Sequence, residues 1–275
     1  MSQSSSHRKQ RPAKPGTSAG RAGDGEGRAE SAEPSVDAAE IARFEALAET
    51  WWDPQGPMRP LHIMAPVRIG FVRDRAAAAF TRDVAADKPF AGLSLLDIGC
   101  GGGLMAEPMT RLGFAVTAID AAEKNVAVAR RHAAQMGLAI DYRAEPVEGI
   151  ASSGKQFDVV LALEVVEHVA DIDAFLAAAV STVKPGGLMV LSTLNRTAKA
   201  FALAIVGVEY VLGWLPRGTH DWRKFVQPAE LAASLRRAGA RVGELVGMSY
   251  NPLSGRWNIT RDLGVNYFAV ARRDS

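Results

Sequence analysis

Hydrophobic residues in this 275-residue chain gather into short runs that alternate with amphipathic stretches. The sharpest run is Leu93–Ile98, which breaks into four glycines within the next five residues. A continuous apolar run of this length is typical of a buried parallel strand. The glycines permit a sharp turn and a close approach of the backbone to another group. With a helix expected from about Leu104, this stretch is predicted to be the cofactor corner of a doubly wound α/β sheet.

The alternation continues from this first strand to the end of the chain. Further strands are expected at 114–120, 140–143, 157–163, 188–193, 241–248 and 265–272. Helices are expected at 104–112, 122–136, 172–183 and 228–238. This order predicts a doubly wound, mostly parallel, Rossmann-like sheet with helices on both faces.

The residues before the first predicted strand divide into a tail and a helical cap. Residues 1–35 are rich in Ser, Gly, Arg and Pro and almost free of large apolar groups, so we expect a disordered tail. Their basic, acid-free start also suits a mitochondrial transit peptide, although an apolar helical face is missing. Residues 36–275 are expected to form one domain. Its residues 36–90 hold two helical patterns, which form an N-terminal helical cap placed to cover the cofactor mouth.

An unusually long insertion, 195–228, follows the fifth strand. Within it, 200–215 is apolar apart from Glu209. This run is too short and too interrupted for a membrane span. It suits a helix that lines an apolar substrate mouth or lies on a bilayer surface, and equally a buried core helix.

Composition narrows the class of protein. The net charge is only +2, so nothing indicates a nucleic-acid partner. The single cysteine, Cys100, excludes an intrachain disulfide and suits a reducing compartment.

The first candidate chemistry is in the glycine loop. Asp97 lies two residues before Gly99 and begins the pattern D-x-G-x-G-x-G, which includes Gly101. A carboxylate here would face the positively charged amino-acid end of S-adenosylmethionine (SAM). Asp120 ends the second strand, where its two oxygens would accept hydrogen bonds from both hydroxyls of a ribose.

The same loop also fits a different cofactor. Gly101-x-Gly103-x-x-Ala106 matches the dinucleotide fingerprint, so an NAD-dependent enzyme is an alternative. Asp120 does not discriminate, because dinucleotide enzymes carry an acid at the same place. We favour SAM because Asp97 precedes the loop and because the rest of the chain follows the order of a methyltransferase.

The second candidate site is the stretch EVVEH, which follows the fourth strand. If it opens a helix, Glu164, Glu167 and His168 share one face at spacings i, i+3 and i+4. Two functions suit such a cluster: His168 or Glu164 as a general base, or all three as ligands of a divalent metal. A phenol ionises only near pH ~10, so methyl transfer to its oxygen needs one of these aids.

Several blocks carry a family resemblance. LDIGCGGG, VTAID, EVVEHV and VKPGG resemble, in this order, the class I SAM-dependent methyltransferases. More specifically, WWDPQGPMRPLHIMAPVRIGFV, the insertion STLNRTAKAF…QPAEL, YNPLSGRWNI and VNYFAVA resemble the ubiquinone-biosynthesis O-methyltransferases. The resemblance covers about Ile41 to Ala271.

The resemblance implies an activity and a cofactor site. The family methylates catechol-type intermediates that bear a polyprenyl chain, 2-polyprenyl-6-hydroxyphenol and 3-demethylubiquinol. Arg68, Gly99, Asp120 and Leu163 fall on its SAM-binding positions. Arg68 would pair with the cofactor's carboxylate, and Leu163 would pack beside the adenosine.

The resemblance also implies a metal and a membrane. Glu164, Glu167 and His168 match the positions implicated in divalent-metal dependence, with Mg²⁺ as the expected ion. The insertion resembles a part thought to contact lipid, which implies peripheral association with the bacterial inner membrane from the cytoplasm. The transit-peptide alternative would place the protein in the mitochondrial matrix. Other ubiquinone-biosynthesis proteins are possible partners.

Three alternatives stay open at this point. A methyltransferase of another small acceptor would share the glycine loop but lack the specific insertion. An NAD-dependent enzyme would bind nicotinamide and not SAM. A non-catalytic membrane-associated scaffold would keep its function without the EVVEH cluster.

Overall fold

The computed structural model describes Met1 and residues 35–203, 221–251 and 255–274. Nearly all of the expected tail and most of the apolar part of the insertion therefore lie outside the described residues. Among the described helices, none has the length and apolar character needed to cross a membrane.

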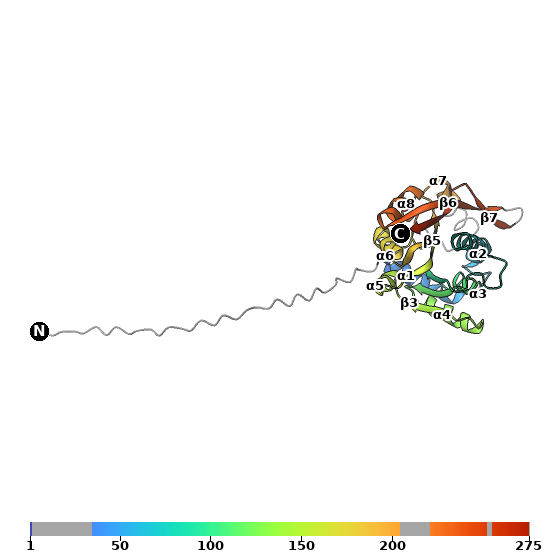
Figure 1. Ribbon diagram of the computed structural model, residues 1–275. Coiled ribbons are helices and arrows are strands. Elements are labelled where there is room, and N and C mark those ends of the chain that lie inside the picture. The colour runs from blue at the N-terminus through green and yellow to red at the C-terminus, as the bar shows by residue number, and fades with distance from the viewer. Residues whose placement is uncertain (2–34, 204–220, 252–254, 275) are drawn as a thin grey trace. The chain divides into compact units, whose positions relative to one another are not determined.

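One eight-stranded sheet, in the order β3-β2-β1-β4-β5-β8-β6-β7, organises the described residues (Figure 1). Strands β1 to β5 pair in parallel with one another. The pairs β5–β8, β8–β6 and β6–β7 are antiparallel. The strands are β1 Ser94–Ile98, β2 Ala115–Asp120, β3 Asp141–Ala144, β4 Phe157–Leu163, β5 Val183–Leu194, β6 Ala240–Asn251, β7 Arg256–Thr260 and β8 Asn266–Arg273. The prediction of a doubly wound, mostly parallel sheet is confirmed.

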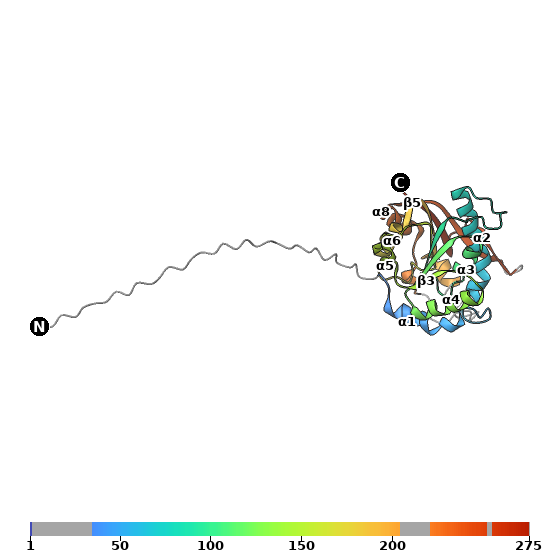
Figure 2. The ribbon, with the colours of Figure 1, turned by 60° about the horizontal axis from the view of Figure 1, so that its bottom comes forward.

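Helices cover both faces of the sheet, as Figures 1 and 2 show. One face packs against α2 (Arg59–Phe80), α3 (Ala106–Arg111) and α4 (Glu123–Gln135). The other packs against α5 (Val147–Ser152), α6 (Ile172–Ser181) and α8 (Pro228–Arg237). Alternate strand residues point to opposite faces, so Leu95 joins the first core and Leu96 the second.

The order of the strands positions the site. β1 lies between β2 and β4, and Ile98 is level with Ile119 on one side and Ala162 on the other. The carboxyl ends of these three parallel strands therefore meet at one edge, where the direction of winding reverses. Ligands of open α/β sheets bind at such a switch point.

Two helices precede the sheet in the expected cap region. α1 (Ala38–Ala46) is capped by Asp37, whose side chain accepts a hydrogen bond from the Ala39 amide. α2 begins at Arg59, earlier than the expected helix at 67–80. Its early start is explained by Pro60, because proline lacks only an amide hydrogen that the first helical turn leaves unbonded.

Smaller elements differ from the sequence-based expectation. α5 and β7 were not expected, and β5 begins at Val183 instead of 188. The described ends of the insertion hold the short helices α7 (Ala198–Ala200) and η3 (Trp222–Lys224). Another short 3₁₀ helix, η1 (Ala48–Thr50), links α1 to the segment before α2.

Candidate active site

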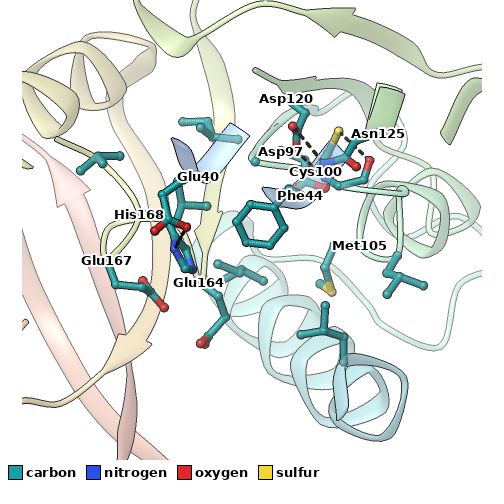
Figure 3. Close-up of a pocket in the computed structure, with 18 of the residues that line it drawn as sticks. Glu40, Phe44, Asp97, Cys100, Met105, Asp120, Asn125, Glu164, Glu167 and His168 are labelled. Atoms are coloured by element: carbon teal, nitrogen blue, oxygen red, sulfur yellow. Dashed lines mark hydrogen bonds and ion pairs between the residues drawn. The ribbon is translucent and has the colours of Figure 1, made fainter. Parts of the chain in front are cut away.

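A cavity of about 830 Å³ lies at the carboxyl edge of β1, β2 and β4 (Figure 3). Its walls come from α1, α2, the glycine loop and the turn after β4. All nine predicted site residues line it: Arg68, Asp97, Gly99, Gly101, Asp120, Leu163, Glu164, Glu167 and His168. Segments that are far apart in the sequence thus share one cavity.

The glycine loop needs glycine for two separate reasons. Gly99 and Gly101 have φ of 68° and 53°, in the left-handed region that L side chains avoid. A Cβ at Gly99 would lie 2.6 Å from Val165 Cγ2, and one at Gly101 would overlap the ring of Trp51. The loop is therefore enclosed by the turn after β4 on one side and by the cap on the other.

Asp120 ties the glycine loop to the end of β2. Its Oδ2 accepts a hydrogen bond from the Gly101 amide at 2.9 Å, and its Oδ1 accepts from the Ala122 amide at 2.8 Å and from Asn125 Nδ2 at 3.3 Å. Burial raises the pKa of the Asp120 carboxyl, against the opposing effect of these hydrogen bonds. The carboxyl lines the cavity, where the predicted ribose contact requires it.

Asp97 is a buried acid with an unsatisfied oxygen. It is 3% exposed, and its Oδ2 has no hydrogen-bond partner among the described residues. Burial and the negative charge of Asp120 raise the pKa of Asp97 to about 7. A cationic group in the cavity would satisfy this oxygen and favour the ionised form.

Two adjacent tryptophans hold the cap against the loop. Trp51 Nε1 donates a hydrogen bond to Asn125 Oδ1 at 2.9 Å, and Trp52 Nε1 donates to the Gly102 carbonyl at 2.9 Å. Neither tryptophan is predicted from the sequence to belong to the site. A pair of large aromatic residues in a proline-rich segment was the only available signal.

The stretch 164–168 is a turn, so the predicted helix is wrong. Glu164 has a φ of 56°, and its amide donates to the Ser192 carbonyl at 2.9 Å, which continues the hydrogen bonding of β4 with β5. This left-handed residue ends the strand abruptly and cannot begin a right-handed helix. Glu164, Glu167 and His168 consequently do not share a helical face.

Arg68 and Glu164 pair with each other. Arg68 Nη2 lies 3.0 Å from Glu164 Oε1, which also accepts from Ser192 Oγ at 2.8 Å. Arg68 is 5% exposed, and its Nε has no hydrogen-bond partner among the described residues. The arginine that was expected to bind the cofactor's carboxylate thus holds a protein carboxylate.

Glu167 points into the protein. It is 3% exposed, with Oε2 accepting from Thr193 Oγ1 at 2.8 Å and Oε1 without a partner among the described residues. Burial and the charge of Glu164 raise the pKa of Glu167 to about 7.

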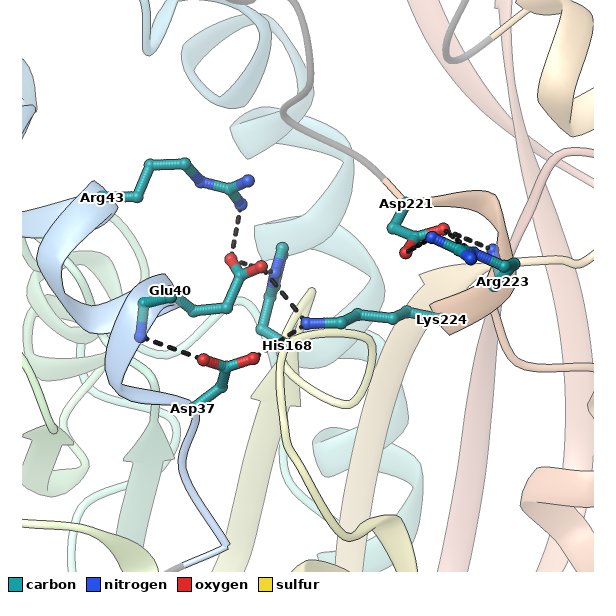
Figure 4. Close-up of polar contacts among 8 residues, drawn as sticks. Asp37, Glu40, Arg43, His168, Asp221, Arg223 and Lys224 are labelled. Atoms are coloured by element: carbon teal, nitrogen blue, oxygen red, sulfur yellow. Dashed lines mark hydrogen bonds and ion pairs between the residues drawn. The ribbon is translucent and has the colours of Figure 1, made fainter.

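His168 is held by the cap helix α1 (Figure 4). Its Nδ1 lies 3.1 Å from Glu40 Oε2, and its ring contacts Phe44 edge to face at 5.2 Å. Glu40 is also 2.6 Å from Arg43 Nη2 and 3.4 Å from Lys224 Nζ. The hydrogen bond with His168 is the largest cause of the lowered pKa of Glu40, so this acid is ionised near neutral pH. No motif or spacing in the sequence indicates Glu40 as a partner of His168.

The three residues do not form a metal centre as they are arranged. Two carboxylates and an imidazole are suitable donors for Mg²⁺. However, within the described part of the chain no three His, Cys, Asp or Glu side chains lie close enough together to hold an ion. Each of the three has a different protein partner, so the predicted metal cluster is not formed.

This combination of features defines a class of protein. A doubly wound sheet, a glycine loop after β1, acids on β1 and β2 and one cavity at their carboxyl ends are the architecture of a class I SAM-dependent methyltransferase. Residues 70–245 match the family model of a methyltransferase domain. The SAM-bound magnesium protoporphyrin IX methyltransferase from Synechocystis PCC 6803 shares the fold, with a TM-score of 0.58 and 15% identity over 88% of this chain and all of that chain.

Curated relatives narrow the class. The chain is 55% identical to the ubiquinone biosynthesis O-methyltransferase of Methylobacterium nodulans, over 89% of this chain and 98% of the relative. It is 59% identical to the enzyme of the same name from Paramagnetospirillum magneticum, over 83% of this chain and 91% of that relative. The chain belongs to the ubiquinone biosynthesis O-methyltransferases, enzymes that take their methyl group from SAM. The NAD-dependent and scaffold alternatives are set aside.

Proposed function

We propose that the enzyme methylates a catechol hydroxyl of polyprenylated ubiquinone precursors, 2-polyprenyl-6-hydroxyphenol and 3-demethylubiquinol. The observation that carries the proposal is the single cavity that joins the glycine loop to the turn holding His168. Apolar side chains, including Phe44, Leu61 and Met64, line the same cavity and suit a substrate with a prenyl chain.

In the proposed cofactor site, SAM lies along the glycine loop. Its ammonium group faces the unsatisfied Oδ2 of Asp97, and its ribose hydroxyls face Asp120. Gly99 and Gly101 line the cavity, and glycine at both positions permits the left-handed backbone that the loop adopts there. Leu163, at the end of β4, packs beside the adenosine.

Arg68 binds the carboxylate of SAM in this proposal. The cofactor's carboxylate replaces Glu164 as the partner of Nη2, and the Arg68 Nε without a described partner becomes a second donor. Glu164 is then released toward the acceptor. Support comes from the burial of Arg68 beside the cavity, because a buried guanidinium needs an anionic partner.

His168 is proposed as the general base. The acceptor oxygen attacks the methyl carbon of SAM, the carbon–sulfur bond breaks, and S-adenosylhomocysteine leaves. His168 Nε2 takes the hydroxyl proton, while ionised Glu40 accepts a hydrogen bond from Nδ1–H and so selects the tautomer. Alignment of the acceptor with the methyl group supplies most of the rate enhancement.

A divalent cation such as Mg²⁺ is a second candidate for activating the hydroxyl. The observation that favours it is Glu167 Oε1, a buried carboxylate oxygen without a partner among the described residues. Glu164 and His168 would have to leave Arg68 and Glu40 to complete the site. No step of the mechanism above is assigned to the ion.

We also propose peripheral contact with the cytoplasmic face of the inner membrane through 195–228. Large side chains at both described ends of this insertion are exposed: Phe201 (46%), Leu203 (51%) and Trp222 (37%). Exposed apolar groups of this kind suit the headgroup boundary of a bilayer that contains the substrate. Other ubiquinone-biosynthesis proteins are further proposed partners, and we propose no nucleic-acid partner.

The proposal is tested by methyl transfer from labelled SAM to a short-chain prenyl catechol, with and without a chelator. Product that survives chelation supports His168 as a simple base. Product that is lost on chelation and restored by Mg²⁺ supports the cation. If SAM binds and no catechol is methylated, the proposed acceptor is wrong.

A further inference from the structure

The glycine loop is also held from the side that does not line the cavity. Gly102, whose carbonyl accepts the hydrogen bond from Trp52 Nε1, is absent from the cavity wall. The indole of Trp52 stacks on the imidazole of His132, with ring centroids 3.5 Å apart and an interplanar angle of 8°. His132 Nδ1 in turn lies 2.6 Å from Glu107 Oε1.

Glu107 anchors this chain of contacts in the protein interior. It is 1% exposed, and its other oxygen, Oε2, is 3.3 Å from Arg111 Nη2. Burying a carboxylate is costly, and replacing such a pair by apolar residues is often neutral or stabilising. Stability alone is thus a weak reason for placing an acid and an imidazole here. The pair does, however, fix the imidazole on which Trp52 lies.

The contacts join three separate parts of the fold. Glu107 is on α3, His132 is on α4, and Trp52 belongs to the segment between α1 and α2. None of the three side chains lines the cavity. Among the described side-chain hydrogen bonds, the one from Trp52 Nε1 to the Gly102 carbonyl links this group of side chains to the glycine loop. We therefore expect their effect on the cofactor to pass through the position of the loop.

We propose that Trp52, His132 and Glu107 are positioning residues that hold the glycine loop in its SAM-binding conformation. Stacking on His132 orients the indole, and Glu107 orients the imidazole. The hydrogen bond to the Gly102 carbonyl then fixes the outer peptide of the loop. This inference rests on the proposed placement of SAM along the loop.

The test measures SAM affinity by calorimetry in the full-length enzyme. Trp52→Phe keeps a ring on His132 and removes the hydrogen bond to Gly102. His132→Gln keeps a donor for Glu107 and removes the stacked ring. We expect each variant to raise the Kd for SAM about 3- to 10-fold, since a hydrogen bond of this kind contributes about 1 kcal/mol. Arg131→Gln is the matched control, because Arg131 is a neighbour on α4 that pairs at the surface with Glu49.

A second readout separates positioning from general destabilisation. In steady-state assays, the KM for SAM should rise, whereas kcat at saturating SAM and the KM for the catechol stay within twofold. Both substitutions act through the same series of contacts, so their effects should not add. The Kd of the double variant for SAM should be at most about twofold above that of the single variant with the higher Kd.

Asp120→Asn distinguishes a failure of the positioning role from a failure of the proposed placement of SAM along the loop. If it weakens SAM binding while Trp52→Phe and His132→Gln bind SAM as the wild type does, the positioning role is wrong and the cofactor placement stands. If all three variants bind SAM normally, the placement along the loop is wrong and the inference fails with it. An equal loss in Arg131→Gln would also overturn the inference.

Discussion

The ring of Trp51 occupies the space that a side chain at Gly101 would need. A residue of the N-terminal cap thus makes glycine obligatory in a loop that follows the first strand, some 50 positions later. The cap and the cofactor loop are fitted to each other and have to be considered as one unit.

Gly101→Ala should therefore abolish SAM binding and destabilise the fold. Alanine at a φ of 53° costs about 1 kcal/mol, and the overlap with Trp51 adds about 1–3 kcal/mol. Gly137→Ala is the matched control, since its φ is 66° and nothing lies near its Cβ position. Chemical denaturation and SAM calorimetry check both variants. Equal losses in the two would show that Trp51 does not constrain position 101.

SAM affinity should depend on pH through Asp97. The ammonium of SAM favours the ionised carboxylate, whose pKa is about 7 in the ligand-free protein. Affinity should fall about tenfold per pH unit below pH 7 and level off above it. Asp97→Asn should bind more weakly and without this slope. Calorimetry in buffers from pH 5.5 to 8.5 is the measurement, and a pH-independent wild type would contradict the contact with the ammonium.

Asp120→Ala should weaken SAM binding by about 1–3 kcal/mol, the range for losing hydrogen bonds to a charged acceptor. Asp141→Ala, at the start of β3, is a suitable control because its carboxylate pairs at the surface with Arg143. If the Asp120 variant keeps wild-type affinity in calorimetry, Asp120 does not contact the cofactor.

His168→Gln should lower kcat at saturating SAM by about 100-fold or more, the usual contribution of a general base. Glu40→Gln should lower it about tenfold, because a neutral amide holds the imidazole less firmly. The Kd for SAM should stay close to the wild-type value in both. Glu45→Gln, on the same helix and paired at the surface with Lys124, is the control. Unchanged kcat in the His168 variant would remove it from catalysis.

The free energy of unfolding should fall as the pH rises from about 5 to 7. Burial, followed by the charge of Glu164, raises the pKa of Glu167 to about 7, so the folded protein holds a proton that the unfolded chain has already lost. The slope from this group is at most about 1.4 kcal/mol per pH unit and ends above pH 7. Glu167→Gln should show a smaller slope than the wild type in denaturant titrations. An unchanged slope would show that Glu167 ionises normally.

The sequence by itself determined most strands of the sheet and the part of the cavity wall at the carboxyl ends of β1, β2 and β4. Apolar runs, periodic helices and the glycine break are local signals, and parallel strands bring their carboxyl ends to one edge. Asp97, the glycine loop, Asp120 and Leu163 could therefore be placed together without a structure. The conformation of the EVVEH stretch could not be predicted from local signals, because the left-handed conformation of Glu164 follows from its pairing with β5.

Only the tertiary structure decided which side chains meet. His168 pairs with Glu40 across 128 positions, Trp51 reaches Asn125 across 74, and Arg68 pairs with Glu164. No periodicity relates such positions, since each contact depends on where the cap comes to rest against the edge of the sheet. The same physical reason explains why the predicted metal cluster is not seen among the described residues. Glu164, Glu167 and His168 are close in sequence, but the turn places them beside Arg68, Thr193 and Glu40 respectively.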